Sequence, residues 1–148
     1  MTIISITPIK KGEPIQDNYG PIFTTMSKNV RKEKLAGRYW FNCNCIACTE
    51  DWPALSILPN EPEGCTPKVL KQLQKLESST FYKAVDLMDA GKPRLAIQLL
   101  TSYIEDCTAL LKKSVKDWKM PYKTILLAQE AMKLCYACTG STHILKPK

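Results

Sequence analysis

The sequence predicts an α+β protein in which a short β segment and a cysteine-rich loop precede a helical C-terminal domain. Three observations support this fold class. The first residues are β-branched and broken by turn residues, three cysteines crowd together in "CNCIAC", and apolar residues recur at helical spacing after Thr66. We divide the chain into residues 1–24, 25–52, a linker over 53–65 and a helical domain over 66–148.

The N-terminal segment predicts strands followed by one exposed helix. "IISI" is short and β-branched, Pro8 and Gly12 mark turns, and "PIQDNYGPIF" suits an extended chain. The charged run "SKNVRKEKLAG" predicts a helix that Ser27 caps and Gly37 ends. The region after Trp52 is rich in proline and has no apolar period, which predicts the linker.

The C-terminal domain predicts antiparallel helical hairpins, the first capped by Thr66 with Pro67 at its first position. Predicted helix limits are 67–77, 79–90, a third from Pro93, and a fourth from Pro121 to Gly140. The third carries one apolar stripe, which consists of Ile97, Leu100, Ile104, Cys107 and Leu111. "FYKAVDLMDAGKPRLAIQLLTSYI" is typical of a tetratricopeptide helix pair, but no second copy follows at that period, so ordinary helix packing is an equal alternative.

Composition excludes several classes of protein. The 148 residues suffice for one domain or two small units, and 45% hydrophobic with 24% charged residues is ordinary for a globular chain. No apolar run approaches the roughly 20 residues of a membrane span, and no signal peptide is evident, so we expect a cytoplasmic or nuclear protein. The net charge is +7, and a solvated helix face rather than a nucleic-acid site is expected for the basic residues Lys28, Arg31, Lys32, Lys34 and Arg38.

Cys43, Cys45 and Cys48 have the C-x-C-x2-C spacing of a Zn2+ site. The alternative is three free thiols, which would be prone to oxidation. A closed zinc site needs a fourth ligand, and Cys65 and His143 are both candidates. We expect the other cysteines, Cys107, Cys135 and Cys138, to serve packing.

The order "IKKGEPIQDNYGP", a basic helix and "RYWFNCNCIAC" resembles the end of a SET domain with its post-SET loop in the SET-and-MYND protein-lysine methyltransferases. Their helical tetratricopeptide-type C-terminal domain would correspond to residues 66–139. The resemblance implies Zn2+ and S-adenosylmethionine as cofactors. It also implies that Tyr19 is the catalytic tyrosine, Tyr39 lines the lysine channel and Phe41 packs by the cofactor's adenine, although packing in a core is the alternative for all three rings.

In that family the fourth zinc ligand is a cysteine of an asparagine-histidine-serine-cysteine segment, which this sequence lacks, as it lacks the glycine-rich cofactor-binding stretch and the MYND finger. We therefore expect a C-terminal fragment or a truncated product. Three hypotheses follow: part of a lysine methyltransferase, a zinc-stapled helical module that recruits a protein partner, and a basic nucleic-acid binder. The second is favoured for the isolated chain and the third is the least favoured, while membrane binding is not expected.

Overall fold

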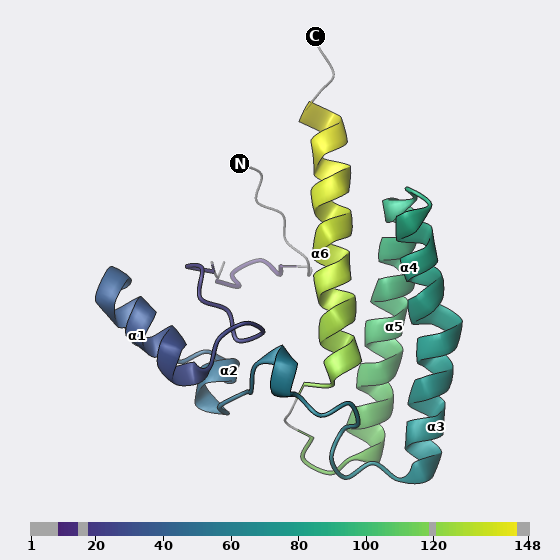
Figure 1. The fold of residues 1–148 in the computed structure, drawn as a ribbon, viewed down its shortest axis with the longest axis horizontal. Helices are drawn as coiled ribbons and strands as arrows, with labels where there is room; N and C mark the ends of the chain where they lie inside the picture. Colours follow the sequence, from purple (N-terminus) through teal and green to yellow (C-terminus); the bar gives the residue numbers. More distant parts are fainter. Residues whose placement is uncertain (1–8, 15–17, 119–120, 145–148) are drawn as a thin grey trace.

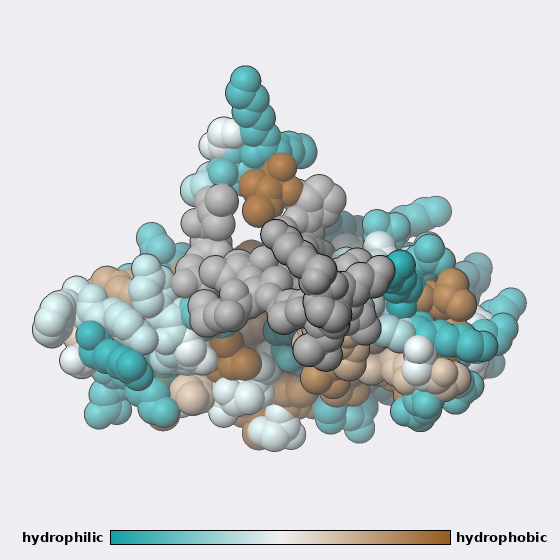
Figure 2. All heavy atoms as spheres, turned by 90° about the horizontal axis from the view of Figure 1, so that it is seen from above, coloured by the Kyte–Doolittle hydropathy of each residue, from teal (hydrophilic) through white to brown (hydrophobic). Residues whose placement is uncertain are grey.

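The computed structural model describes residues 9–14, 18–118 and 121–144, with side chains up to Thr139. It consists of an N-terminal part that carries α1 and α2 and a C-terminal helical part that contains α3 to α6 (Figure 1). The charged N-terminal part is mostly hydrophilic on the face seen in Figure 2, at the side where α1 lies. The three clustered cysteines lie in the N-terminal part, and α3 to α6 make up the C-terminal part.

The described residues contain no strand, so the α+β prediction is wrong for this part of the chain, which is all helical. "IISI" lies outside the described residues. Within the described residues 9–14 and 18–24, the backbone N–H of Glu13 donates to the carbonyl of Lys10 (3.0 Å) and that of Gly20 donates to the Asn18 side chain (2.9 Å), and both are turn hydrogen bonds. A strand needs a neighbouring strand to accept its ladder bonds, and these residues have none.

Helix α1 (Lys28–Tyr39) buries Leu35 and Arg31. It does not end at Gly37 as predicted. Trp40 adopts a left-handed conformation (φ 55°) and donates its backbone N–H to the carbonyl of Ala36 over 3.1 Å, which closes the helix. Ser27 occupies the predicted cap position, but its side chain makes no capping hydrogen bond. The left-handed turn at Trp40 directs the chain into the cysteine loop.

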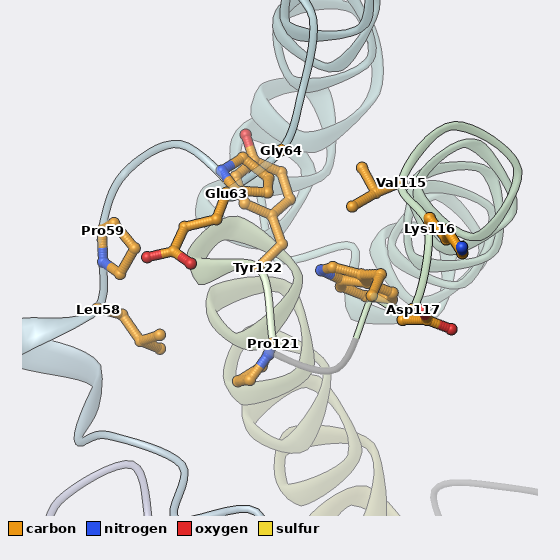
Figure 3. Close-up of a pocket in the computed structure, with 11 residues that line it drawn as sticks. Leu58, Pro59, Glu63, Gly64, Val115, Lys116, Asp117, Pro121 and Tyr122 are labelled. Atoms are coloured by element: carbon orange, nitrogen blue, oxygen red, sulfur yellow. The ribbon is translucent and has the colours of Figure 1, made fainter.

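The linker packs against both parts of the molecule. It contains the 3-10 helix η1 (Leu55–Ile57), and the backbone N–H of Leu55 donates to Thr24 over 3.0 Å. Leu58 is buried and helps to line a pocket of about 390 Å³. Leu58 and Pro59 lie on one side of this pocket, residues 115–117 on the other, and Tyr122 between them (Figure 3).

Helix α3 (Pro67–Leu76), the π-helical segment η2 (Glu77–Phe81) and α4 (Tyr82–Asp89) form one continuous rod. The break predicted near residue 78 is therefore wrong. The predicted start is confirmed, since Thr66 Oγ1 accepts a hydrogen bond from the Val69 N–H (3.4 Å) and Pro67 is the first helical residue.

Helix α5 (Pro93–Ser114) lies between the α3–α4 rod and α6 (Lys123–Ile144), and this confirms the prediction of packed antiparallel helices (Figure 1). Gly91 turns the chain between α4 and α5 with φ 67°. Helix α6 continues past Gly140, its predicted end. No helix in the described part of the chain is both long and apolar enough to cross a membrane.

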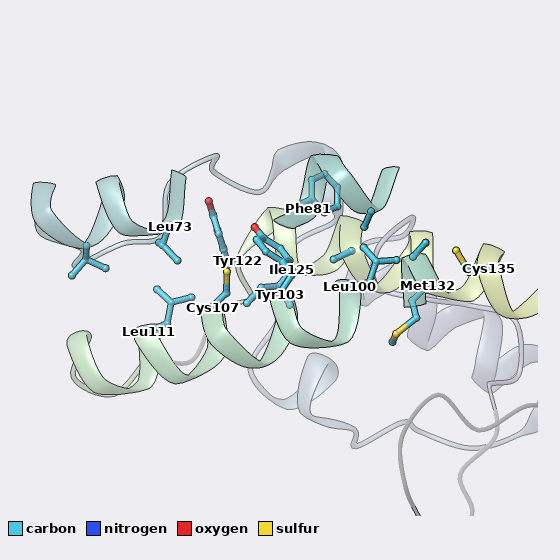
Figure 4. Close-up of a cluster of buried hydrophobic side chains, with 14 residues drawn as sticks. Leu73, Phe81, Leu100, Tyr103, Cys107, Leu111, Tyr122, Ile125, Met132 and Cys135 are labelled. Atoms are coloured by element: carbon cyan, nitrogen blue, oxygen red, sulfur yellow. The ribbon is translucent and has the colours of Figure 1, made fainter. Parts of the chain in front are cut away.

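The core lies between these helices (Figure 4). Leu100, Cys107 and Leu111 are fully buried as predicted, whereas Ile97 and Ile104 are only half-buried. The buried stripe of α5 is thus turned slightly from the predicted one, and it consists of Ala96, Leu100, Tyr103, Cys107 and Leu111.

Candidate metal centre and aromatic cluster

The sulfur atoms of Cys43, Cys45 and Cys48 all lie within 4.8 Å of one another. In a tetrahedral zinc site with Zn–S bonds of about 2.3 Å, neighbouring sulfurs are about 3.8 Å apart. Small adjustments of the side chains would therefore bring three ligands onto one ion. The cluster could hold a metal, and three thiolates are the donor set that suits zinc.

The backbone explains why these sulfurs converge. Cys45 caps the single-turn helix α2 (Ile46–Thr49), and its carbonyl accepts hydrogen bonds from the N–H groups of Cys48 and Thr49, both at 2.9 Å. This turn brings the two ends of the C-x2-C segment together. The Thr49 hydroxyl donates to the carbonyl of Asn44 (3.1 Å), which fixes the residue between Cys43 and Cys45.

The three thiols have different environments. Cys48 is buried, Cys43 is half-buried and Cys45 is exposed. Although Cys45 is exposed as a residue, partial desolvation of its thiol raises its pKa, and a hydrogen bond with Cys43 adds to the increase. Burial also acts to raise the pKa of Cys48, but hydrogen bonds from Arg31 and the neighbouring thiols outweigh it, so its pKa lies below the usual value. Between Cys45 and Cys48, the thiolate form is therefore favoured at the buried Cys48.

Arg31 contacts the cysteine cluster, which the sequence pattern did not predict. Its guanidinium donates hydrogen bonds to Cys48 Sγ (3.4 Å), to the carbonyl of Ala47 (3.1 Å) and to the carbonyl of Met26 (2.7 Å). Only 2% of the residue is exposed, so the prediction of a solvated basic face is wrong here. It holds for the neighbours, since Lys32, Lys34 and Arg38 are exposed.

The three aromatic residues singled out by the sequence meet one another. The ring of Tyr19 lies edge-on to Tyr39 (centroids 5.0 Å apart) and to Phe41 (5.2 Å). Trp40 points away and is 89% exposed. A shallow groove of about 510 Å³ runs beside Tyr19 and Tyr39, and Lys34 and Arg38 help to line it. The three rings therefore form an aromatic wall next to the cysteine loop, and Tyr19 and Tyr39 of this wall line the groove.

Of the two other candidate ligands, Cys65 does not join the cysteine cluster. Cys65 packs against the helical core, and the side chain of His143 lies outside the described ones. Within the described residues the cluster consists of its three cysteines. Cys107 and Cys135 are buried in the core as predicted, but Cys138 is exposed.

Comparison with known proteins gives one significant match. No family model matches the chain, and neither does any solved structure. Over an alignment of 125 residues the chain is 29% identical to protein-lysine N-methyltransferase SMYD4 of Mus musculus. The chain is a distant homologue of that enzyme. The alignment covers 67% of this chain and 16% of SMYD4, so the chain spans about a sixth of its relative.

Proposed function

We propose that this chain is the C-terminal part of an S-adenosylmethionine-dependent protein-lysine N-methyltransferase, with a zinc-binding post-SET loop. The observation that carries the proposal is the convergence of three sulfurs directly after the Tyr19, Tyr39 and Phe41 cluster. The homology to SMYD4 supports the same class of reaction. Free thiolate ligands suit a reducing compartment, so we place the protein in the cytoplasm or nucleus.

The thiolates of Cys43, Cys45 and Cys48 would hold the ion, and a closed tetrahedral site would need a fourth ligand from outside this cluster. In the SET-and-MYND family that the chain resembles, a cysteine of the SET core is this fourth zinc ligand. A bound Zn2+ supplies a fixed crosslink in the loop and no reaction chemistry. Phe41 lies two residues before Cys43, so the crosslink would also hold the aromatic wall in place.

The aromatic wall suits the lysine substrate. A lysine must be neutral to accept a methyl group, yet its free pKa is about 10.4. Removal of water by aromatic side chains disfavours the ammonium form, and the ring faces can bind the methylated product. We assign the Tyr19 hydroxyl to orient the amine, Tyr39 to line the channel, and Phe41 to pack by the adenine of S-adenosylmethionine. The half-exposed ring of Tyr19 fits a channel whose other wall comes from outside this chain.

By itself the chain should be inactive, because positioning both substrates carries much of the catalysis and the chain provides one wall. The isolated chain would then serve as a zinc-stapled helical module that binds a protein partner. One observation favours this second function: α6 buries Ile125, Ala128 and Met132, and also exposes Leu127 (38%) and Leu134 (61%) seven residues apart on its outer face. Leu127 and Leu134 would be the apolar contacts that this partner makes with α6.

The test is a radiolabelled methyl-transfer assay on this chain and on a longer protein that restores the upstream SET segment, with zinc measured in both. We expect about one zinc per chain in both lengths and activity only in the longer one. Absence of zinc from both would refute the metal centre, and lack of activity in the longer protein would refute the methyltransferase assignment. Activity of the short chain would show that the channel is complete without the upstream segment.

A further inference from the structure

Among the described residues, Arg31 is the charged side chain that is buried. Taking a guanidinium out of water costs several kcal/mol unless it is well compensated. Two of its three acceptors are the backbone carbonyls of Met26 and Ala47, which are neutral dipoles. No ion pair joins it to a carboxylate in the part of the chain that the structure describes, where the ion pair found is Lys133 with Glu130. The remaining acceptor is Cys48 Sγ, and a thiolate there would balance the charge.

The contacts of Arg31 also join segments that are distant in the sequence. Met26 lies just before α1, whereas Ala47 and Cys48 belong to α2. Arg31 therefore crosslinks the start of α1 to the turn that carries two of the three sulfurs. The other end of α1 carries Tyr39, about 12 Å further along the helix at 1.5 Å per residue. One rigid element thus connects the cysteine cluster with the aromatic wall.

We propose that Arg31 is a positioning residue of the metal centre, acting through Cys48 and Ala47. This inference rests on the proposed zinc site. Three thiolates and one Zn2+ carry a net charge of −1, and the guanidinium beside Cys48 offsets it. Its planar fork also holds the C-x2-C turn in the conformation that points Cys45 and Cys48 at one ion. Lysine cannot replace it, because a single ammonium at the end of a flexible stem cannot reach acceptors in two directions.

The experiment uses the full chain and three variants: Arg31→Met, Arg31→Lys and, as a matched control, Lys32→Met on the exposed side of the same helix. Zinc affinity is measured by competition with a chelator. Cobalt substitution reports the thiolate ligands through the sulfur-to-cobalt charge-transfer band, and circular dichroism reports helix content. We expect Arg31→Met to weaken zinc binding by roughly 10- to 100-fold, as the loss of supporting contacts to metal ligands typically does.

Arg31→Lys keeps the positive charge but not the contacts in two directions, so it should lose a large part of the zinc affinity that Arg31→Met loses and keep the helix content of the wild type. Lys32→Met should bind zinc like the wild type. If Arg31→Met fails to fold, the zinc affinity of Arg31→Lys alone tests the positioning role. Wild-type affinity in Arg31→Lys, or equal losses in Arg31→Met and Lys32→Met, would overturn the positioning role. A wild-type chain that binds neither zinc nor cobalt would instead overturn the metal centre itself.

A double-mutant comparison separates positioning from general stability. If Arg31 acts through Cys48, then Arg31→Met should weaken the residual cobalt binding of a Cys48→Ser chain much less than it weakens that of the wild type. Equal losses in the two backgrounds would show that Arg31 acts independently of Cys48, and this would overturn the proposal.

Discussion

Tyr19 and Tyr39 lie edge to face with their ring centroids 5.0 Å apart, although Tyr19 precedes α1 and Tyr39 is its last residue. The Arg38 guanidinium covers the Tyr39 ring at 5.4 Å. The segment before α1 and the segment after it therefore meet in one aromatic unit, and Phe41 carries this unit into the cysteine loop. The proposed chemistry depends on this meeting point.

In a longer protein that contains the upstream SET segment, Tyr19→Phe should lower turnover by roughly a hundredfold or more. The substitution keeps the ring contacts with Tyr39 and removes the one hydroxyl assigned to orient the amine, a loss typically worth a few kcal/mol. Steady-state methyl transfer measures the effect. Trp40→Phe is the control, because Trp40 is 89% exposed and should leave turnover unchanged. Full activity of Tyr19→Phe would remove the catalytic assignment.

Cys45→Ser should release zinc and disorder residues 39–50, because metal binding and local folding form one equilibrium. Zinc content after dialysis and backbone amide exchange in this segment measure the two effects. Cys138→Ser is the matched control, since Cys138 is also exposed but lies on α6, outside the cluster. Zinc retained at the wild-type level in Cys45→Ser would show that Cys45 is not a ligand.

Leu100→Ala should destabilise the helical part by about 2–5 kcal/mol while zinc binding stays unchanged. Leu100 is fully buried in the core cluster between α4, α5 and α6, and truncation would leave a cavity there. Urea unfolding followed by circular dichroism measures the loss. Leu134→Ala is the comparison, because Leu134 is 61% exposed and its truncation should cost less than about 0.5 kcal/mol. Similar losses for both would contradict the observed packing.

The stability of the helical part should fall as the pH rises from 9 to 11. Burial raises the pKa of Cys107 to about 11 from an ordinary 9.0, with the charges of Asp106 and Glu77 adding to the shift. The neutral thiol is the form that the fold prefers. Its contribution is therefore complete below pH 9, where the unfolded chain is still protonated, and is lost as the pH rises to the folded value.

The loss due to Cys107 is about 2–3 kcal/mol at most. Burial also raises the pKa of Tyr122 and Cys135, so other groups contribute in the same direction. The measurement therefore compares urea unfolding of the wild type and of Cys107→Ala between pH 8 and 11, under reducing conditions. Cys107→Ala should lose less stability over this range. Parallel pH curves for the two proteins would refute the assignment.

The C-terminal helices were predictable because their signals are local. Thr66, Pro67 and Pro93 mark helix starts by backbone chemistry, and the apolar period of α5 needs no knowledge of its neighbours. The convergence of Cys43, Cys45 and Cys48 was also predictable, since the whole cluster lies within six consecutive residues.

Features that depend on distant contacts were not predicted. Arg31 stands in a charged run and resembles its neighbours, and its burial follows from acceptors 16 and 17 residues further along the chain. One signal was available: Leu35 lies four residues later, so Arg31 shares the single apolar face of α1. The strand prediction failed for a related reason, because a strand is stabilised by a partner that a local pattern does not contain.

The π-helical turn of η2 shows how the α3–α4 rod keeps both its halves in register with α5. A wider turn has the effect of one inserted residue, and one residue in an α-helix corresponds to a rotation of about 100°. Leu73 before the turn, Phe81 at its last residue and Ala84 after it are all buried in the same core. The wider turn is therefore accommodated at the exposed residues Ser78 and Ser79, and the helix on either side keeps its buried face toward the core. The wider turn thus absorbs a rotation of about 100° that one additional residue would otherwise impose on the rest of the rod.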